Sequence, residues 1–249
     1  MPTAAESPSS ATVDPELRER YESVKSRIAS AAPRGGRRPE DVLLVAVSKQ
    51  ALPAQIAALA ELGQRDFGEN RVQHLVERVE SVAGLSCAAS LRWHLIGTLQ
   101  RNKARKAIEL TRLIHSVDNL RIAETLHDDA ARKDRSVSIL IQVNISGEAT
   151  KHGMNPRAVM AVVEQMQNMT GLDLRGLMTM APASDDPAAA RPVFEACREL
   201  FEEICRAKLC GPNFNVLSMG MSGDFEVAIE CGANMVRVGT AIFGSPQAA

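Results

Sequence analysis

Short runs of apolar residues alternate with longer segments of helical periodicity along nearly the whole chain. The apolar runs predict buried parallel strands at 42–48, 65–68, 92–97, 112–117, 137–145, 174–180, 215–220 and 235–239. Helical segments follow at 51–62, 70–83, 101–109, 119–133, 156–169, 187–208 and 223–231, and a last helix begins near Thr240. Eight strand–helix units in 249 residues are what a closed barrel needs. We therefore predict an α/β fold, a single (β/α)8 TIM barrel.

An open, doubly wound sheet is the alternative arrangement of such units. We disfavour it because no G-x-G-x-x-G sequence follows the first strand. An extra helix precedes the barrel, since Asp14 can cap it, Pro15 suits its first position, and apolar residues then recur at helical spacing. Residues 1–13 are rich in Ser, Pro, Ala and Thr, so we predict a disordered N-terminus followed by one domain over 14–249.

Composition changes the picture mainly by exclusion. Apolar residues make up 45% and charged residues 24%, and the formal net charge is -1, so nucleic-acid or anionic-membrane binding is not expected. No apolar run is long enough to span a membrane, and the N-terminus does not resemble a secretory signal. The five cysteines are scattered and lack zinc-site spacing, which favours reduced thiols in a cytoplasmic protein.

Polar and small residues stand where the predicted strands end. The carboxyl ends of parallel barrel strands meet at one face, and active groups gather there. The residues expected at this face are Ser48, Lys49, Glu69, Asn70, His94, Gly97, Ser116, Asn144, Met178, Ser218, Ser222, Arg237, Gly239 and Thr240. We expect the chemistry of the protein to lie among them.

Lys49 directly follows a run of buried apolar positions. We expect partial desolvation there, which disfavours the ammonium form and leaves free amine to attack a carbonyl. The alternative is a surface lysine whose stem lies over the barrel rim. A second lysine near a strand end, Lys151, is expected to be a loop lysine rather than a second Schiff-base residue.

The loops after the seventh and eighth strands favour an anion site. Ser218 and Ser222 lie between the seventh strand and a helix, and Gly239 and Thr240 open the last helix. Small residues and free amides at these two places form the recurrent phosphate site of barrels, although glycines also serve turns and serines also cap helices.

Two further residues have open assignments at this stage. Arg237 lies in the apolar run MVRVG and needs a partner, which is either a carboxylate of a neighbouring strand or a ligand atom at the strand ends. His94 is either a general base or ring-stacking group, or a packed histidine of the barrel core.

Six sequence blocks together resemble the pyridoxal phosphate homeostasis protein family, also known for co-transcription with proline synthetase. They cover about Glu16 to Gly244 and read LVAVSKQ (44–50), GQRDFGENRVQ (63–73), WHLIGTLQRNK (93–103), QVNISGEATKHG (142–153), RGLMTM (175–180) and LSMGMSGDFEVAIECGANMVRVGTAIFG (217–244). The order and number of the blocks make the resemblance specific.

The resemblance implies a barrel of the alanine racemase N-terminal type that holds pyridoxal 5'-phosphate (PLP) as a Schiff base on Lys49. It implies that Arg237 faces the pyridine nitrogen, which a guanidinium keeps unprotonated, so the ring is a weaker electron sink. The phosphate would be surrounded by Ser218, Ser222, Gly239 and Thr240, and the ring by Asn70, His94, Met178 and Met219. One departure is Arg71, where many members have tyrosine, which would change the anion preference of the pocket.

The family is regarded as carrying or buffering PLP, in vitamin B6 homeostasis, without robust turnover. The chain ends soon after the eighth strand, so we expect no second domain of the alanine racemase type, and we expect a monomer whose partners are PLP and apo PLP-enzymes. One alternative is a weak PLP-dependent racemase or decarboxylase, with Lys49 or His94 moving protons. Others are a cofactor-free aldolase with an imine on Lys49, and an interaction protein on a barrel scaffold.

Overall fold

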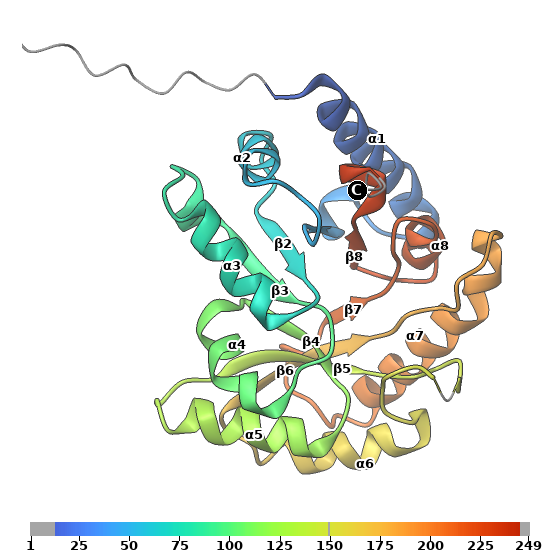
Figure 1. Cartoon of the computed structure of the whole chain (residues 1–249). Coiled ribbons are helices and arrows are strands. Elements are labelled where there is room, and N and C mark those ends of the chain that lie inside the picture. Colours follow the sequence, from blue (N-terminus) through green and yellow to red (C-terminus); the bar gives the residue numbers. More distant parts are fainter. Residues whose placement is uncertain (1–12, 149, 245–249) are drawn as a thin grey trace, which may run out of the picture.

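A computed structural model describes residues 13–148 and 150–244, so most of the segment predicted to be disordered lies outside the described residues. Eight parallel strands close into a barrel in sequence order, and β1 pairs with β8 (Figure 1). The strands are β1 (Leu43–Val47), β2 (Asp66–Glu69), β3 (Arg92–Leu95), β4 (Leu113–Val117), β5 (Val137–Gln142), β6 (Leu172–Met178), β7 (Val216–Ser218) and β8 (Met235–Val238). The predicted (β/α)8 barrel is confirmed, and the open sheet is excluded.

Helices surround the barrel, as Figure 1 shows. They are α1 (Pro15–Ala31), α2 (Pro53–Glu61), α3 (Val72–Val82), α4 (Ala104–Leu110), α5 (Leu120–Ala131), α6 (Pro156–Met166), α7 (Arg191–Arg206), α8 (Phe225–Glu230) and α9 (Thr240–Phe243). The predicted helices at 101–109 and 187–208 both begin as 3-10 turns, Arg101–Lys103 and Pro187–Ala190. Within the described residues, no helix combines the length and apolarity needed to cross a membrane.

The extra N-terminal helix α1 forms as predicted and packs against α8 and α9 (Figure 1). The Asp14 carboxylate caps it by accepting a hydrogen bond from the amide of Glu16, and Pro15 occupies its first position. The face that packs inward consists of Leu17, Tyr21, Val24, Ile28 and Ala31. The helix therefore closes the side of the barrel where the chain returns to β8.

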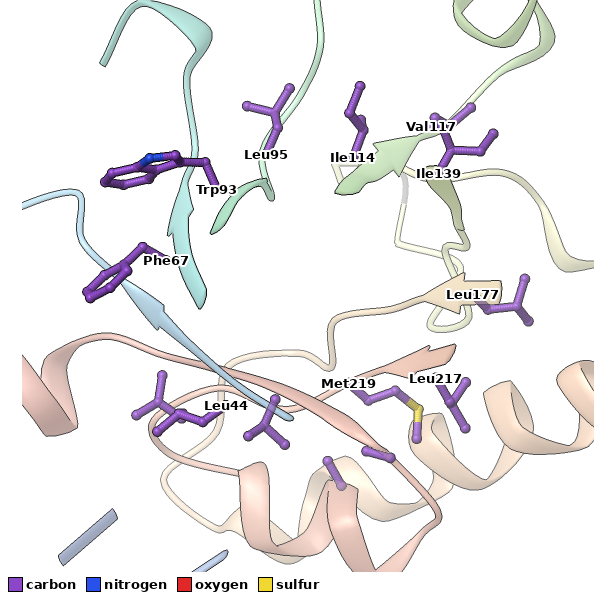
Figure 2. Close-up of a cluster of buried hydrophobic side chains, with 14 of the residues drawn as sticks. Leu44, Phe67, Trp93, Leu95, Ile114, Val117, Ile139, Leu177, Leu217 and Met219 are labelled. Carbon is purple, nitrogen blue, oxygen red and sulfur yellow. The ribbon is translucent and has the colours of Figure 1, made fainter. Parts of the chain in front are cut away.

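Strand side chains alternate between two separate cores. The outer core lies between strands and helices, where Phe67 and Trp93 pack with ring centroids 5.8 Å apart (Figure 2). The inner cluster fills the barrel and consists of Val45, Leu113, Leu140, Met178 and Met235. The small size of the inner cluster leaves room for buried polar side chains inside the barrel, and these build the site.

Candidate functional site

Lys49 lies just past the end of β1, at the carboxyl ends of the strands, which we call the carboxyl mouth. The residue is exposed, so the expectation of partial desolvation is wrong: the apolar run before it is buried, but Lys49 itself is already outside the barrel wall. Its amine is therefore accessible to a carbonyl compound arriving from solvent.

A buried carboxylate anchors the turn that carries Lys49. The Ser48 hydroxyl donates to Glu69 Oε1 over 2.8 Å, and Arg78 of α3 lies 3.5 Å from the same oxygen. Burial raises the pKa of Glu69, although the Ser48 hydrogen bond and Arg78 oppose this effect. These contacts join the end of β1 to β2 and α3, so the backbone beneath Lys49 is fixed.

The loops after β7 and β8 meet at Ser222. Its hydroxyl accepts hydrogen bonds from the amides of Gly239 and Ala241, at 3.2 and 3.3 Å. Gly239 lies against β1, since a Cβ at this position would be 3.3 Å from Cβ of Val47, two residues before Lys49. The structure thus brings Ser222, Gly239 and the exposed Thr240 to the same mouth as Lys49.

Arg237 lies buried inside the barrel below this mouth. Its Nη1 donates to Ser218 Oγ over 2.6 Å and its Nη2 donates to the carbonyl of Thr179 over 3.0 Å. Burial lowers the pKa of Arg237 to about 10, so the guanidinium stays charged at neutral pH. Two of its five N–H donors are used in these contacts, which leaves donors for a ligand.

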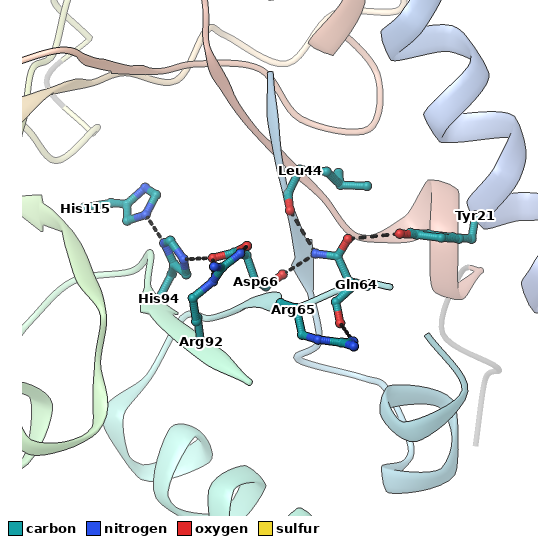
Figure 3. A network of polar contacts seen from close by, with 8 residues as sticks. All are labelled: Tyr21, Leu44, Gln64, Arg65, Asp66, Arg92, His94 and His115. Carbon is teal, nitrogen blue, oxygen red and sulfur yellow. Dashed lines mark hydrogen bonds and ion pairs between the residues drawn. The ribbon is translucent and has the colours of Figure 1, made fainter. Parts of the chain in front are cut away.

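Ser218 continues into a line of hydrogen bonds that crosses the barrel interior. Its Oγ lies 3.1 Å from His115 Nδ1, His115 Nε2 lies 2.9 Å from His94 Nδ1, and His94 Nε2 lies 3.0 Å from Asp66 Oδ1. Figure 3 shows the part from His115 to Asp66, where Arg92 also binds Asp66. We call Asp66, His94, His115, Ser218 and Arg237 the polar chain.

The polar chain has one arrangement of protons that satisfies every member with neutral imidazoles. Arg237 only donates, so the Ser218 hydroxyl donates to His115; His115 then donates to His94, and His94 to the Asp66 carboxylate. Burial, followed by the proximity of His94 and of the positively charged Arg237, lowers the pKa of His115 well below its usual value. Burial raises the pKa of Asp66, but hydrogen bonds from His94 and Arg92 outweigh it and lower the pKa overall. The polar chain thus runs from a cation, Arg237, to an anion, Asp66.

Three of the residues predicted from sequence do not present free side chains at the mouth. Ser218 is fully buried within the polar chain rather than beside Ser222. His94 lines a cavity at the amino ends of the strands, and both of its ring nitrogens are engaged. Met219 packs in the outer core, on the other side of the strand (Figure 2). Met219 faces away from Ser218 because side chains alternate along a strand. The contacts of these three residues with a cofactor stay predictions. Met178, by contrast, lies in the inner cluster.

Asn70 and Arg71 both reach the mouth. Asn70 Oδ1 is buried without a hydrogen-bond partner among the described residues. A groove beside it is lined by Arg71 and by Lys103, both of which are exposed. Arg71 therefore adds positive charge next to Asn70. Lys151, in contrast, pairs with Glu148 over 3.0 Å, as expected of a loop lysine.

Sequence reasoning missed Asp66 and His115 as members of the site. Both lie at inward-facing strand positions: Asp66 is the first residue of β2, and His115 the third of β4. His94 and Arg237 are likewise third in β3 and β8. Aligning the strands by position would have shown that these polar residues share the barrel interior.

The neutral, buried His115 makes stability depend on pH. Because its folded pKa lies below the unfolded value of about 6.5, the unfolded state takes up the proton first as pH falls. Stability that is present above about pH 6.5 is therefore lost below it, with a slope approaching ~1.4 kcal/mol per pH unit. Urea unfolding at several pH values between 7.5 and 5.5 measures this slope.

The matched variants separate His115 from other titrating groups. His115→Gln keeps a donor and an acceptor but does not titrate. The slope of its unfolding free energy against pH should therefore be smaller than that of the wild type by the contribution of one titrating proton. His152→Gln, at a position 65% exposed, should keep the wild-type slope. Identical slopes for wild type and His115→Gln would contradict a neutral His115 in the polar chain.

Comparison with known proteins shows which family shares this architecture. Residues 24–247 match the family model described as the alanine racemase N-terminal domain. The pyridoxal phosphate homeostasis protein of Escherichia coli K12 is 39% identical over 222 residues, 89% of this chain and 93% of that protein. That of Vibrio cholerae is 37% identical over 228 residues, 92% of this chain and 95% of that protein.

Solved structures agree with this grouping. PipY of Synechococcus elongatus with PLP bound has a TM-score of 0.78 and 36% identity, covering 92% of this chain and 100% of that one. Alanine racemase of Clostridium difficile has a TM-score of 0.71 at 16% identity, covering 94% of this chain and 57% of that one, which shows the shared fold alone. By these matches, the chain belongs to the pyridoxal phosphate homeostasis protein family, with a barrel of the alanine racemase N-terminal type.

Proposed function

We propose that the chain binds PLP at the carboxyl mouth, holds it as a Schiff base on Lys49, and serves PLP homeostasis without robust turnover. The observation that carries this proposal is the convergence of three groups at one end of the barrel. An exposed amine on Lys49 lies beside the turn at Gly239, and both lie above the buried guanidinium of Arg237. The names of the relatives and the PLP bound to PipY support the choice of cofactor.

The residues at the mouth fit the parts of PLP. The amides of Gly239 and Ala241 already meet an oxygen, that of Ser222, so they are directed to bind an oxyanion such as the phosphate, with the Thr240 hydroxyl beside them. Arg237 supplies a donor for the pyridine nitrogen. The unpartnered Asn70 side chain supplies a polar contact for a ring substituent, with Met178 packed in the barrel below.

The chain's own residues argue against efficient catalysis. PLP supplies an aldehyde that condenses reversibly with an amine, and an electron-withdrawing ring. Racemisation needs a base on each face of the substrate carbon. Lys49 is available, but both ring nitrogens of His94 are bound in the polar chain. Arg237 also keeps the ring nitrogen unprotonated.

Hydrogen exchange tests the absence of turnover. The PLP-loaded chain is incubated with alanine in deuterium oxide, beside an alanine racemase as positive control. Exchange at the α-carbon should stay near the rate of free PLP, because Arg237 leaves the pyridine nitrogen unprotonated and the ring then withdraws electrons weakly. Rapid exchange that disappears in Lys49→Ala would instead establish a PLP enzyme.

Thr240→Ala should weaken PLP binding more than pyridoxal binding, because only PLP carries the phosphate. Loss of one hydrogen bond to a charged group amounts to about 1.5–3 kcal/mol, or roughly 10- to 100-fold in affinity. Thr170→Ala, an exposed position in the turn between α6 and β6 at the opposite end of the barrel, is the matched control and should leave both affinities unchanged. Equal losses for the two ligands in Thr240→Ala would mean that the phosphate is held elsewhere.

The proposal extends to how PLP is used. The chain acts as a monomer in the cytoplasm and passes PLP to apo PLP-enzymes, since a reversible imine at an exposed lysine releases the aldehyde again. Mixing the PLP-loaded chain with an apo PLP-enzyme should activate that enzyme. If the apo-enzyme is present in excess over the PLP-loaded chain and still gains no activity, transfer of PLP would be contradicted.

A further inference from the structure

A second cavity, of about 290 Å³, opens at the amino ends of the strands, opposite Lys49. We call it the amino-end cavity. The first residues of three consecutive strands line it, namely Leu43 of β1, Asp66 of β2 and Arg92 of β3. Its volume lies near the lower end of the range for small-molecule sites, ~300–1,000 Å³, so it suits a small organic ligand.

The amino-end cavity has an excess of positive charge. Arg92, Arg112 and Arg175 line it, whereas Asp66 is its one carboxylate among the described residues. Asp66 is already bound by Arg92 and His94. Arg112 is exposed. The Nη1 of Arg175 donates to Asp173 Oδ2 over 3.3 Å, but its Nε is buried without a hydrogen-bond partner among the described residues. Buried donors require acceptors, so the cavity favours an anion.

The remaining walls are apolar. Leu113 and Met235, at the first positions of β4 and β8, are both 5% exposed and belong to the inner cluster. A ligand that satisfies the cavity must therefore combine negative charge with a short hydrocarbon segment. An inorganic oxyanion would meet the arginines but leave the apolar wall uncovered.

We propose that the amino-end cavity binds a short-chain dicarboxylate. Arg112 pairs with one carboxylate, because a planar guanidinium matches a carboxylate with two parallel hydrogen bonds, and Arg175 donates to the other with the N–H groups that Asp173 does not use. Its methylene groups pack on Leu113 and Met235. This site is separate from the carboxyl mouth and requires neither Lys49 nor PLP.

Calorimetric titration of the full chain with succinate, at low ionic strength, tests this proposal. We expect one site per chain, with affinity weakened about tenfold or more in Arg112→Gln and in Arg175→Gln. Arg132→Gln is the matched control, since the Arg132 side chain is 61% exposed at the C-cap of α5 and pairs with Asp129. Arg112→Lys and Arg175→Lys, which keep the charge, serve if a glutamine variant fails to fold, and they too should bind more weakly.

The other outcomes would overturn the proposal. They are no binding below about 10 mM succinate, equal weakening in Arg132→Gln, and loss of binding in Thr240→Ala, which would place the anion at the carboxyl mouth. Titrations with and without PLP should agree. Even if Lys49 were shown not to form the Schiff base, these results could still be interpreted, because succinate binding is measured independently of any imine.

Discussion

Lys49→Ala should abolish borohydride-reducible PLP on the chain while leaving the fold intact. Lys49 is exposed, and the Ser48–Glu69 hydrogen bond holds its turn without the lysine side chain. Exposed substitutions usually change stability by no more than about 0.5 kcal/mol, so the melting temperature should shift by about 2 °C at most. Mass spectrometry after reduction, together with thermal unfolding, measures both quantities.

Lys151→Ala is the control for this result. Lys151 pairs with Glu148 in the loop after β5, so its removal should leave the reduced PLP adduct at the wild-type amount. A full adduct on Lys49→Ala and none on Lys151→Ala would transfer the covalent role to Lys151.

His115→Leu should give the largest loss of stability among single substitutions in the polar chain. It removes the acceptor of the Ser218 hydroxyl and the donor to His94, and both of these groups are buried. A buried polar group left unpaired destabilises by about 1–3 kcal/mol, so the two together amount to roughly 2–6 kcal/mol. Urea unfolding measures the difference.

The same substitution should weaken PLP binding, because Ser218 orients Arg237 and His115 orients Ser218. We expect about a tenfold loss, measured at low temperature where the variant is folded. His115→Gln, which keeps a donor and an acceptor, should lose less than half as much stability and retain PLP affinity. If His115→Leu and His115→Gln were alike in both measurements, His115 would not be a positioning residue for Arg237.

The barrel could be predicted because parallel strands are buried on both faces and therefore form continuous apolar runs. Each predicted strand overlaps an observed one, from 42–48 against Leu43–Val47 to 235–239 against Met235–Val238. The structure also brings Ser222 and Gly239 together in the loops after β7 and β8, while the phosphate site expected there stays a prediction. The sequence correctly placed Lys49 at the mouth, but it wrongly predicted that the residue would be partly buried.

The direction of side chains could not be predicted from apolar runs. A run such as NVLSMG has no alternation, so nothing in it decides whether Ser218 or Met219 faces the barrel interior. Register shifts, such as the one between Ile139 and Leu140 where β5 pairs with β6, add to the ambiguity. The polar chain also depends on contacts across the barrel, as between His115 of β4 and Ser218 of β7, which local sequence does not encode.

The most direct test of the central claim is the absorption spectrum of the purified chain with added PLP, before and after borohydride, followed by peptide mapping. We expect an imine band that disappears on reduction and a PLP label on the peptide containing Lys49. The absence of such a band, or a label on another lysine, would contradict the account; absence of the band would favour a cofactor-free aldolase with its imine on Lys49.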